Sequence, residues 1–281
     1  MEFSVATWNL HQGGLHAAWD ALSTLDADVV LVQEAAVPAG WTPPAGVRSW
    51  PPIDRPDLWG SKGGRYWSAG VVVLNPEFTV RPFADLVVRA AQGPLEEGRP
   101  GRTGVLAACN LELQAHTVVT VASAYGMWER DAAGTSISEG TMNHILDDFL
   151  PTLPSEQSVV LGGDFNIWIQ PHQGAVWPAY QAIFDRLTSA KLIDCLQAED
   201  GWGRAPLADC SCGGGPGCRH VRTYRHRWQP SSNPWQNDYV FASESMARNL
   251  VACSVLDDDA YWALSDHCPV LARFAFTSPV L

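Results

Sequence analysis

The chain has 281 residues, of which 46% are hydrophobic and 17% charged, a composition that excludes a disordered protein and supplies a sizeable core. Its 30 acidic residues against 18 lysines and arginines give a formal net charge of -12. This charge disfavours tight non-specific binding of DNA but allows a small or partly single-stranded substrate held by a metal ion. No stretch approaches the roughly 20 apolar residues of a membrane span. With seven cysteines, an odd number, and no N-terminal targeting signal, we expect a cytoplasmic protein.

Apolar patterning predicts strands and helices in alternation along the chain. Residues 3–9 alternate in polarity and predict a strand, and an apolar stripe over residues 16–25 predicts a helix. Continuous apolar runs, typical of strands covered on both faces, follow at 28–33, 69–74, 105–113, 118–124 and 159–161. We expect helices at 138–153 and 179–187, and closing strands at 240–241 and 269–276. Strands outnumber helices and interleave with them, so we predict an α/β layered fold, with residues 1–281 as one domain.

Polar clusters stand where five of these strands end. They are Asn9, Gln33-Glu34, Gly163-Asp164-Phe165-Asn166, Asn237-Asp238-Tyr239 and Ser265-Asp266-His267. Active-site residues often occupy such positions, and carboxylates gathered in one cleft repel each other unless a cation neutralises them. Oxygen ligands of this kind suit Mg²⁺ or Mn²⁺, and a neighbouring histidine supplies a group tunable near neutral pH. Taken singly, each cluster also fits an ordinary turn, cap or solvated strand end.

Five segments together resemble the endonuclease/exonuclease/phosphatase superfamily, the group that contains DNase I and exonuclease III. The segments are TWNLHQG at 7–13, VQE at 32–34, GGDFN at 162–166, NDYVF at 237–241 and SDHCPV at 265–270. Each is weak alone, but they follow the family's order across nearly the whole chain. The resemblance implies a DNase I-like four-layer sandwich of two mixed β-sheets flanked by helices, and a magnesium-dependent hydrolase of phosphate esters.

The resemblance also implies roles for the matching residues. Glu34 is expected to bind the metal directly, with Asn9 and Asp266 assisting directly or through waters. Asp164 is expected to orient and deprotonate the attacking water, and Asn166 to hold that water or a phosphate oxygen. These roles amount to positioning and electrostatic stabilisation, the usual basis of phosphoryl transfer.

On the same grounds His267, oriented by Asp238, is expected to bind the scissile phosphate and stabilise its developing charge. Tyr125, in VASAYG at 121–126, is similar to the tyrosine of exonuclease III and the apurinic endonucleases, where DNase I-like members place a histidine. The sequence departs from the apurinic branch directly afterwards, because Gly126-Met127-Trp128 replaces its Pro-Asn. Packing in the core or at the rim is the alternative for Tyr125.

A polar stretch rich in glycine and proline, at 201–235, is too long to be a featureless loop, so we expect it to be functional or pinned. Cys210, Cys212, Cys218 and His220 lie within eleven residues there and have tetrahedral zinc chemistry, with His226 as a substitute ligand. Their spacing is unlike that of common zinc fingers. A structural zinc site is therefore one interpretation, and a reduced metal-free loop or a disulfide are the others.

Candidate substrate-binding residues are two arginines and two tryptophans. Arg222 and Arg225 follow the cysteine-containing insert in the most basic stretch of an acidic protein, and Trp128 and Trp168 lie close to proposed catalytic segments. Arginine beside aromatic residues suits phosphate pairing and base stacking. A solvated loop and core packing are the alternatives. Cys109, Cys195, Cys253 and Cys268 fall in or near apolar runs and are expected to be buried.

Three functions are compatible with the sequence. The favoured one is a metal-dependent phosphodiesterase or nuclease acting on DNA, RNA or a nucleotide. The alternative is a phosphatase or phosphodiesterase acting on a small phosphorylated metabolite or a lipid head group, which the net charge of -12 favours. A non-catalytic scaffold that binds a protein through a zinc insert is the third, and retention of every matched site residue argues against it.

Overall fold

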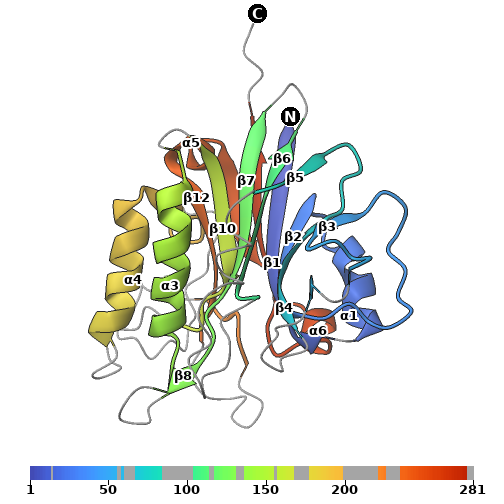
Figure 1. Ribbon diagram of the computed structural model, residues 1–281, viewed down its shortest axis with the longest axis horizontal. Coiled ribbons are helices and arrows are strands. Elements are labelled where there is room, and N and C mark those ends of the chain that lie inside the picture. The colour runs from blue at the N-terminus through green and yellow to red at the C-terminus, as the bar shows by residue number, and fades with distance from the viewer. Residues whose placement is uncertain are drawn as a thin grey trace, which may run out of the picture.

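Two stacked β-sheets form the centre of the protein, and helices cover their outer faces (Figure 1). The computed structural model describes residues 1–13, 15–55, 58–59, 67–83, 104–113, 117–130, 136–154, 157–167, 177–198, 221–225 and 235–276. Trp168, Cys210, Cys212, Cys218, His220 and His226 lie outside the described residues, so the zinc site stays a prediction.

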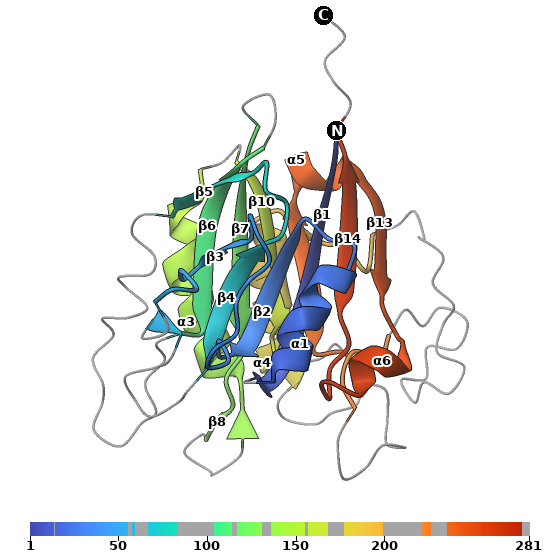
Figure 2. The same cartoon turned by 90° about the vertical axis from the view of Figure 1, so that its right-hand side faces the viewer.

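The first sheet contains strands from both the N-terminal and the C-terminal parts of the chain. Across the sheet its strands are β13 (Leu250–Val255), β14 (Val270–Ala275), β1 (Glu2–Gly13), β2 (Val29–Ala35), β4 (Ser68–Val73) and β3 (Arg48–Trp50). β1 is parallel to β2 and antiparallel to β14, so the sheet is mixed. Helix α1 (His16–Ala21) and a 3-10 turn (Leu22–Thr24) follow β1 and pack on its outer face (Figure 2).

The second sheet is built from the middle of the chain. Its strands are β11 (Leu192–Asp194), β12 (Asp238–Ser243), β10 (Ser158–Asp164), β7 (Val118–Tyr125), β6 (Leu106–Glu112) and β5 (Thr79–Pro82). β10 is parallel to β7 and antiparallel to β12, so this sheet is also mixed. Helices α3 (Glu139–Phe149) and α4 (Trp177–Ser189) cover its outer face (Figure 1). The expected four-layer sandwich is confirmed.

The remaining elements are short. They are the hairpin strands β8 (Glu129–Arg130) and β9 (Ser136–Ile137), the 3-10 turn η4 (Leu150–Thr152), and helices α5 (Glu244–Ala247) and α6 (Asp259–Trp262). None of the helices in the described part of the chain is long and apolar enough to cross a membrane. The four cysteines predicted to be buried, at 109, 195, 253 and 268, are buried.

Alternation along the strands distributes apolar side chains over three cores. In β2, Val29 and Leu31 point into the core between the sheets, whereas Val30 and Val32 pack under α1. In β10, Val160 faces the core between the sheets and Leu161 faces α3 and α4. Such strands are covered on both faces, which explains their continuous apolar sequences.

A buried polar contact fixes one sheet on the other just inside the edge where the polar clusters lie. Gln33 Nε2, from the first sheet, donates hydrogen bonds to Thr7 Oγ1 at 3.0 Å and to Ser123 Oγ of the second sheet at 2.9 Å. Ser123 Oγ donates in turn to the carbonyl of Val32 at 2.8 Å. Because each buried polar group here has a partner, the network holds the two sheets in one relative position.

Candidate active site

Strand direction brings the polar clusters to one edge of the sandwich, the lower edge in Figure 1. β1 and β2 are parallel and so are β7 and β10, so their carboxyl ends lie together. β12 and β14 run antiparallel to β10 and β1, and therefore begin where those strands end. Residues from five distant segments meet at this edge for that reason.

Tyr125, Asp164 and Asp238 form a row across the second sheet, because Asp164 is the register partner of both other residues. The first sheet contacts this row through Asn9. Asn9 Nδ2 donates to Asp164 Oδ2 at 2.8 Å and lies 3.3 Å from Glu34 Oε1, which also accepts a hydrogen bond from the Tyr125 hydroxyl at 3.0 Å. The phenol of Tyr125 is therefore part of the carboxylate cluster.

Asn166 holds the Asp164 carboxylate. Its backbone N–H donates to Asp164 Oδ1 at 2.9 Å and its Nδ2 donates to Oδ2 at 3.0 Å. Asn166 adopts a left-handed backbone, with φ of 50°, a conformation that non-glycine residues adopt mainly where the surroundings enforce it. Its Oδ1 accepts hydrogen bonds from Trp128 Nε1 at 2.8 Å and Asn237 Nδ2 at 3.3 Å, which fixes the amide with its N–H toward Asp164.

His267 lies between two of the acids. Its Nδ1 donates to Asp238 Oδ2 at 2.8 Å, and its Nε2 lies 3.7 Å from Asp164 Oδ2. The ring of Tyr224 packs against the imidazole, with centroids 4.7 Å apart. Thr223 Oγ1 accepts the backbone N–H of Asp238 at 3.1 Å, so the segment before β12 supports this pair.

Burial and crowded charge shift the pKa values of these groups. Burial, with smaller contributions from the charges of Asp238 and Glu34, raises the pKa of Asp164 to about 8, although His267 opposes the shift. Burial alone lowers the pKa of His267, but the charges of Asp238 and Asp164 outweigh it and raise that pKa to about 10. The imidazole is therefore protonated at neutral pH. Ligand atoms of Asp164, Asp238 and His267 lie within 4.8 Å of one another, so this trio is also a possible metal site.

Asp266 lies beside a histidine that the sequence interpretation missed. His11 Nδ1 lies 2.9 Å from Asp266 Oδ1. Burial raises the pKa of Asp266, but the contact with His11 and the charges of His267 and His11 outweigh burial and lower it overall. His11 stands two residues after Asn9 in TWNLHQG, but no local pattern pairs it with an acid at the other end of the chain. Thr223 and Tyr224 belong to the basic stretch that contains Arg222 and Arg225, but no local pattern predicted their contacts with Asp238 and His267.

The predicted substrate-binding residues are not all at the cluster. Trp128 reaches it through Asn166 and is 40% exposed. The Arg225 guanidinium lies 4.0 Å from the ring centroid of Trp262 and pairs with Asp257 at 3.4 Å, and the backbone N–H of Arg225 donates to the carbonyl of Asp266 at 2.8 Å. Arg225 is therefore anchored next to the site. Arg222 is half-buried, and its backbone carbonyl accepts a hydrogen bond from the Cys268 thiol at 3.4 Å.

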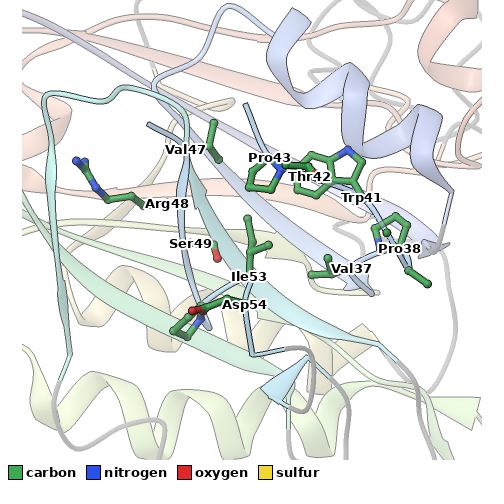
Figure 3. Close-up of a pocket in the computed structure, with 13 residues that line it drawn as sticks. Val37, Pro38, Trp41, Thr42, Pro43, Val47, Arg48, Ser49, Ile53 and Asp54 are labelled. Atoms are coloured by element: carbon green, nitrogen blue, oxygen red, sulfur yellow. The ribbon is translucent and has the colours of Figure 1, made fainter. Parts of the chain in front are cut away.

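A separate pocket of about 590 Å³ lies beside α1 and β3, lined mainly by apolar residues between Val37 and Asp54 (Figure 3). Two of its polar side chains are engaged in hydrogen bonds with other parts of the protein. Trp41 Nε1 donates to Asp20, and Arg48 donates to the carbonyls of Pro76 and Phe78. Its lining includes none of the acidic residues of the cluster, so we place the active site at the strand ends.

Solved structures with a similar fold include two endonucleases and one further catalytic domain. The endonuclease domain of TRAS1, a telomere-specific non-LTR retrotransposon, has a TM-score of 0.60 and 16% identity, covering 98% of this chain and 100% of that one. The AP endonuclease LMAP from Leishmania major has a TM-score of 0.64 and 15% identity, covering 98% and 88%. The catalytic domain of APE2 from Xenopus laevis has a TM-score of 0.65 and 14% identity, covering 99% and 94%. At such identities the likeness shows the fold.

No curated protein matches the chain significantly. A family profile does, over residues 6–267, a span that contains all five polar clusters. The chain therefore belongs to the Endonuclease/Exonuclease/phosphatase family.

Proposed function

We propose that the protein is a divalent-metal-dependent phosphodiesterase that hydrolyses nucleic acid or nucleotide phosphodiester bonds by attack of water. The observation that carries this proposal is the facing pair Asp164 and His267. The acid is held by Asn9 and Asn166, the imidazole is held by Asp238, and Nε2 and Oδ2 lie 3.7 Å apart. One group accepts a proton and the other donates a hydrogen bond to negative charge, which is the division that water attack on a phosphate requires.

The donor set next to this pair suits a hard divalent cation. Glu34 and Asp266 supply carboxylate oxygens, and Asn9 holds Glu34 and Asp164 together through Nδ2. Mutual repulsion among the acids contributes to the raised pKa of Asp164, and a bound cation relieves it. Oxygen ligands of this kind fit Mg²⁺ or Mn²⁺. When bound, such an ion polarises the phosphoryl oxygen and offsets charge on the leaving group.

Within the trio Asp164, Asp238 and His267, we assign proton transfer and phosphate binding rather than metal ligation. A protonated imidazole has no lone pair for a metal, and the charges of Asp238 and Asp164 keep His267 protonated by raising its pKa. Its Nδ1 is also engaged with Asp238. Nε2–H is then the donor that faces the substrate.

A bound cation would lower the raised pKa of Asp164, and the ionised carboxylate would then receive the proton of the attacking water. Among the described residues its Oδ1 accepts one hydrogen bond, from the N–H of Asn166, so it keeps capacity for a water molecule. The water oxygen forms a bond to phosphorus as its proton passes to this carboxylate, and the bond from phosphorus to the leaving oxygen breaks. His267 Nε2–H donates to a non-bridging phosphate oxygen while charge builds there, with Asp238 fixing the ring.

Aromatic and basic groups at the same edge favour a nucleic acid or nucleotide. Trp128 presents an exposed indole beside Asn166, and Arg225 stacks on Trp262 close to Asp266. Bases stack on such surfaces regardless of sequence. Two of the similar structures are endonucleases, which agrees with this substrate class. The net charge of -12 favours the alternative, a small phosphorylated metabolite or a lipid head group.

A substrate panel tests the proposal. Single-stranded and duplex oligonucleotides, a duplex with an abasic site, a nitrophenyl phosphodiester, sugar and inositol phosphates and sphingomyelin vesicles are each incubated with Mg²⁺, Mn²⁺ or EDTA. We expect oligonucleotide or diester cleavage that EDTA abolishes. Turnover confined to monoesters or vesicles supports the alternative substrate. Absence of turnover together with absence of Mn²⁺ binding by calorimetry contradicts an enzymatic function.

Trp128 offers a narrower test, because it bonds to Asn166 and exposes its ring. Trp128→Phe removes the N–H donor but keeps an aromatic face, so we expect kcat to fall about 5- to 10-fold, the value of one hydrogen bond, with KM little changed. Trp128→Ala also removes the stacking surface, so KM for oligonucleotides is expected to rise about 5- to 100-fold. Val251→Ala, at an equally exposed apolar residue of β13, is the control. Identical kinetics for all three variants would remove Trp128 from the site.

A further inference from the structure

The end of β1 has an unusual backbone just after Asn9. His11 and Gln12 both adopt left-handed conformations, with φ of 50° and 56°, and the pairing of β1 with β2 shifts register between Asn9 and Gly13. Two successive non-glycine residues in this conformation carry strain that only the surrounding contacts can maintain. The contacts made by His11 and Gln12 must therefore stabilise this backbone.

This short segment contacts the two carboxylates proposed to bind the metal, those of Glu34 and Asp266, and also Asn9, which holds Glu34. The backbone N–H of His11 donates to Asn9 Oδ1 at 2.8 Å, and the backbone N–H of Gln12 donates to Glu34 Oε2 at 3.1 Å. The His11 side chain contacts the segment before β14, where its Nδ1 lies 2.9 Å from Asp266 Oδ1. A regular strand would point alternate groups to opposite faces and could not make these contacts together.

We propose that His11 is a positioning residue of the metal site, which fixes the Asp266 carboxylate through Nδ1 so that its second oxygen, Oδ2, is set for the cation. The role rests on the proposed function. The side chains of His11 and Asp266 are only 27% and 14% exposed, so the contact is better shielded than an ordinary surface pair. A group that contacts one oxygen of a metal-binding carboxylate restricts that carboxylate to the orientation in which its other oxygen can bind the ion.

Two substitutions separate this role from a structural one. His11→Gly removes the imidazole, and glycine adopts the left-handed backbone readily, so the substitution adds no backbone strain of its own. His11→Asn places an amide Nδ2 close to the position of the imidazole Nδ1, and asparagine also accepts this backbone. Lys191→Gly is the matched control, because Lys191 has φ of 59° and an exposed side chain on a remote turn.

The experiment titrates Mn²⁺ into the full chain by calorimetry and measures the Mn²⁺ dependence of turnover at one fixed pH. We expect His11→Gly to weaken Mn²⁺ binding about 10- to 100-fold, with kcat at saturating Mn²⁺ near the wild-type value. His11→Asn is expected to stay within about 3-fold of wild type, because it keeps the donor to Asp266. Lys191→Gly is expected to bind Mn²⁺ as wild type does.

Each contrary result has a distinct meaning. Wild-type affinity in His11→Gly overturns the role of His11 and leaves the proposed function intact. Equal loss in His11→Asn and His11→Gly also overturns it, because the imidazole Nε2, which asparagine lacks, is then the group that matters. A wild-type chain that binds no Mn²⁺ contradicts the proposed function itself. Thermal unfolding of each variant verifies that the compared proteins are folded.

Discussion

Asp164→Asn is expected to lower kcat about 100- to 10,000-fold, the range over which positioned general bases contribute. The amide cannot take the proton of the attacking water. It also disrupts the local hydrogen bonds, because Asp164 accepts from Asn9 on one oxygen and from Asn166 on both. Whichever way the new amide turns, its NH₂ faces an N–H donor. Single-turnover kinetics with saturating Mn²⁺ measure the effect on the chemical step.

The companion variant His267→Gln tests the other half of the pair. It removes the donor aimed at the phosphate, and a loss of about 100- to 1,000-fold is expected. Since both residues serve one transition state, Asp164→Asn combined with His267→Gln should cost much less than the product of the two single losses. Asp147→Asn, at an acid of α3 that is 65% exposed, is the control. Retention of more than a tenth of wild-type kcat by Asp164→Asn contradicts the assigned role.

Gly126→Ala is expected to destabilise the fold and displace the site at once. A Cβ at this position would lie 1.9 Å from the carbonyl oxygen of Phe165 and 2.4 Å from its carbonyl carbon. The backbone N–H of Gly126 also donates to the carbonyl of Asp164 at 2.7 Å. The contact is with backbone, so the segment from Asp164 to Asn166 must move. We expect a loss of about 1–3 kcal/mol or more in the free energy of unfolding, as for overpacked sites.

The kcat of Gly126→Ala should also fall, by about 100-fold, because a displacement near 1 Å disrupts catalytic geometry to that extent. Denaturant unfolding and kcat measured below the unfolding transition separate the two effects. Gly40→Ala is the control for replacing a glycine without a close contact, because a Cβ added there would meet nothing within 4 Å; unlike Gly126, Gly40 also has a left-handed backbone, with φ of 76°. Gly40→Ala should lower the free energy of unfolding by about 1–2 kcal/mol, because alanine is strained in this conformation, and should leave kcat unchanged. Normal stability and activity in Gly126→Ala would show that this close approach has no consequence.

Long elements with strong apolar patterns were predictable, whereas short edge strands were not. The runs at 28–33 and 118–124 correspond to β2 and β7, because both faces of these strands are covered. β3, β5 and β11 have three or four residues each, too few to establish a period of two, and burial along β13, at the sheet edge, does not follow that period. The helix expected at 138–153 ends at Phe149, and Pro151 lies in the 3-10 turn that follows, where it cannot donate an α-helical hydrogen bond.

The sequence by itself determined which polar residues stand at strand ends, because a buried apolar strand must stop where the chain becomes polar. It therefore indicated the family and Asn9, Glu34, Asp164, Asp238 and His267, whose roles remain proposals. Only the tertiary structure decided how these groups are paired. The contacts of His11 with Asp266 and of Tyr224 with His267 join segments far apart in the chain. Such contacts leave no local pattern, because the direction and register of distant strands, rather than neighbouring residues, place them together.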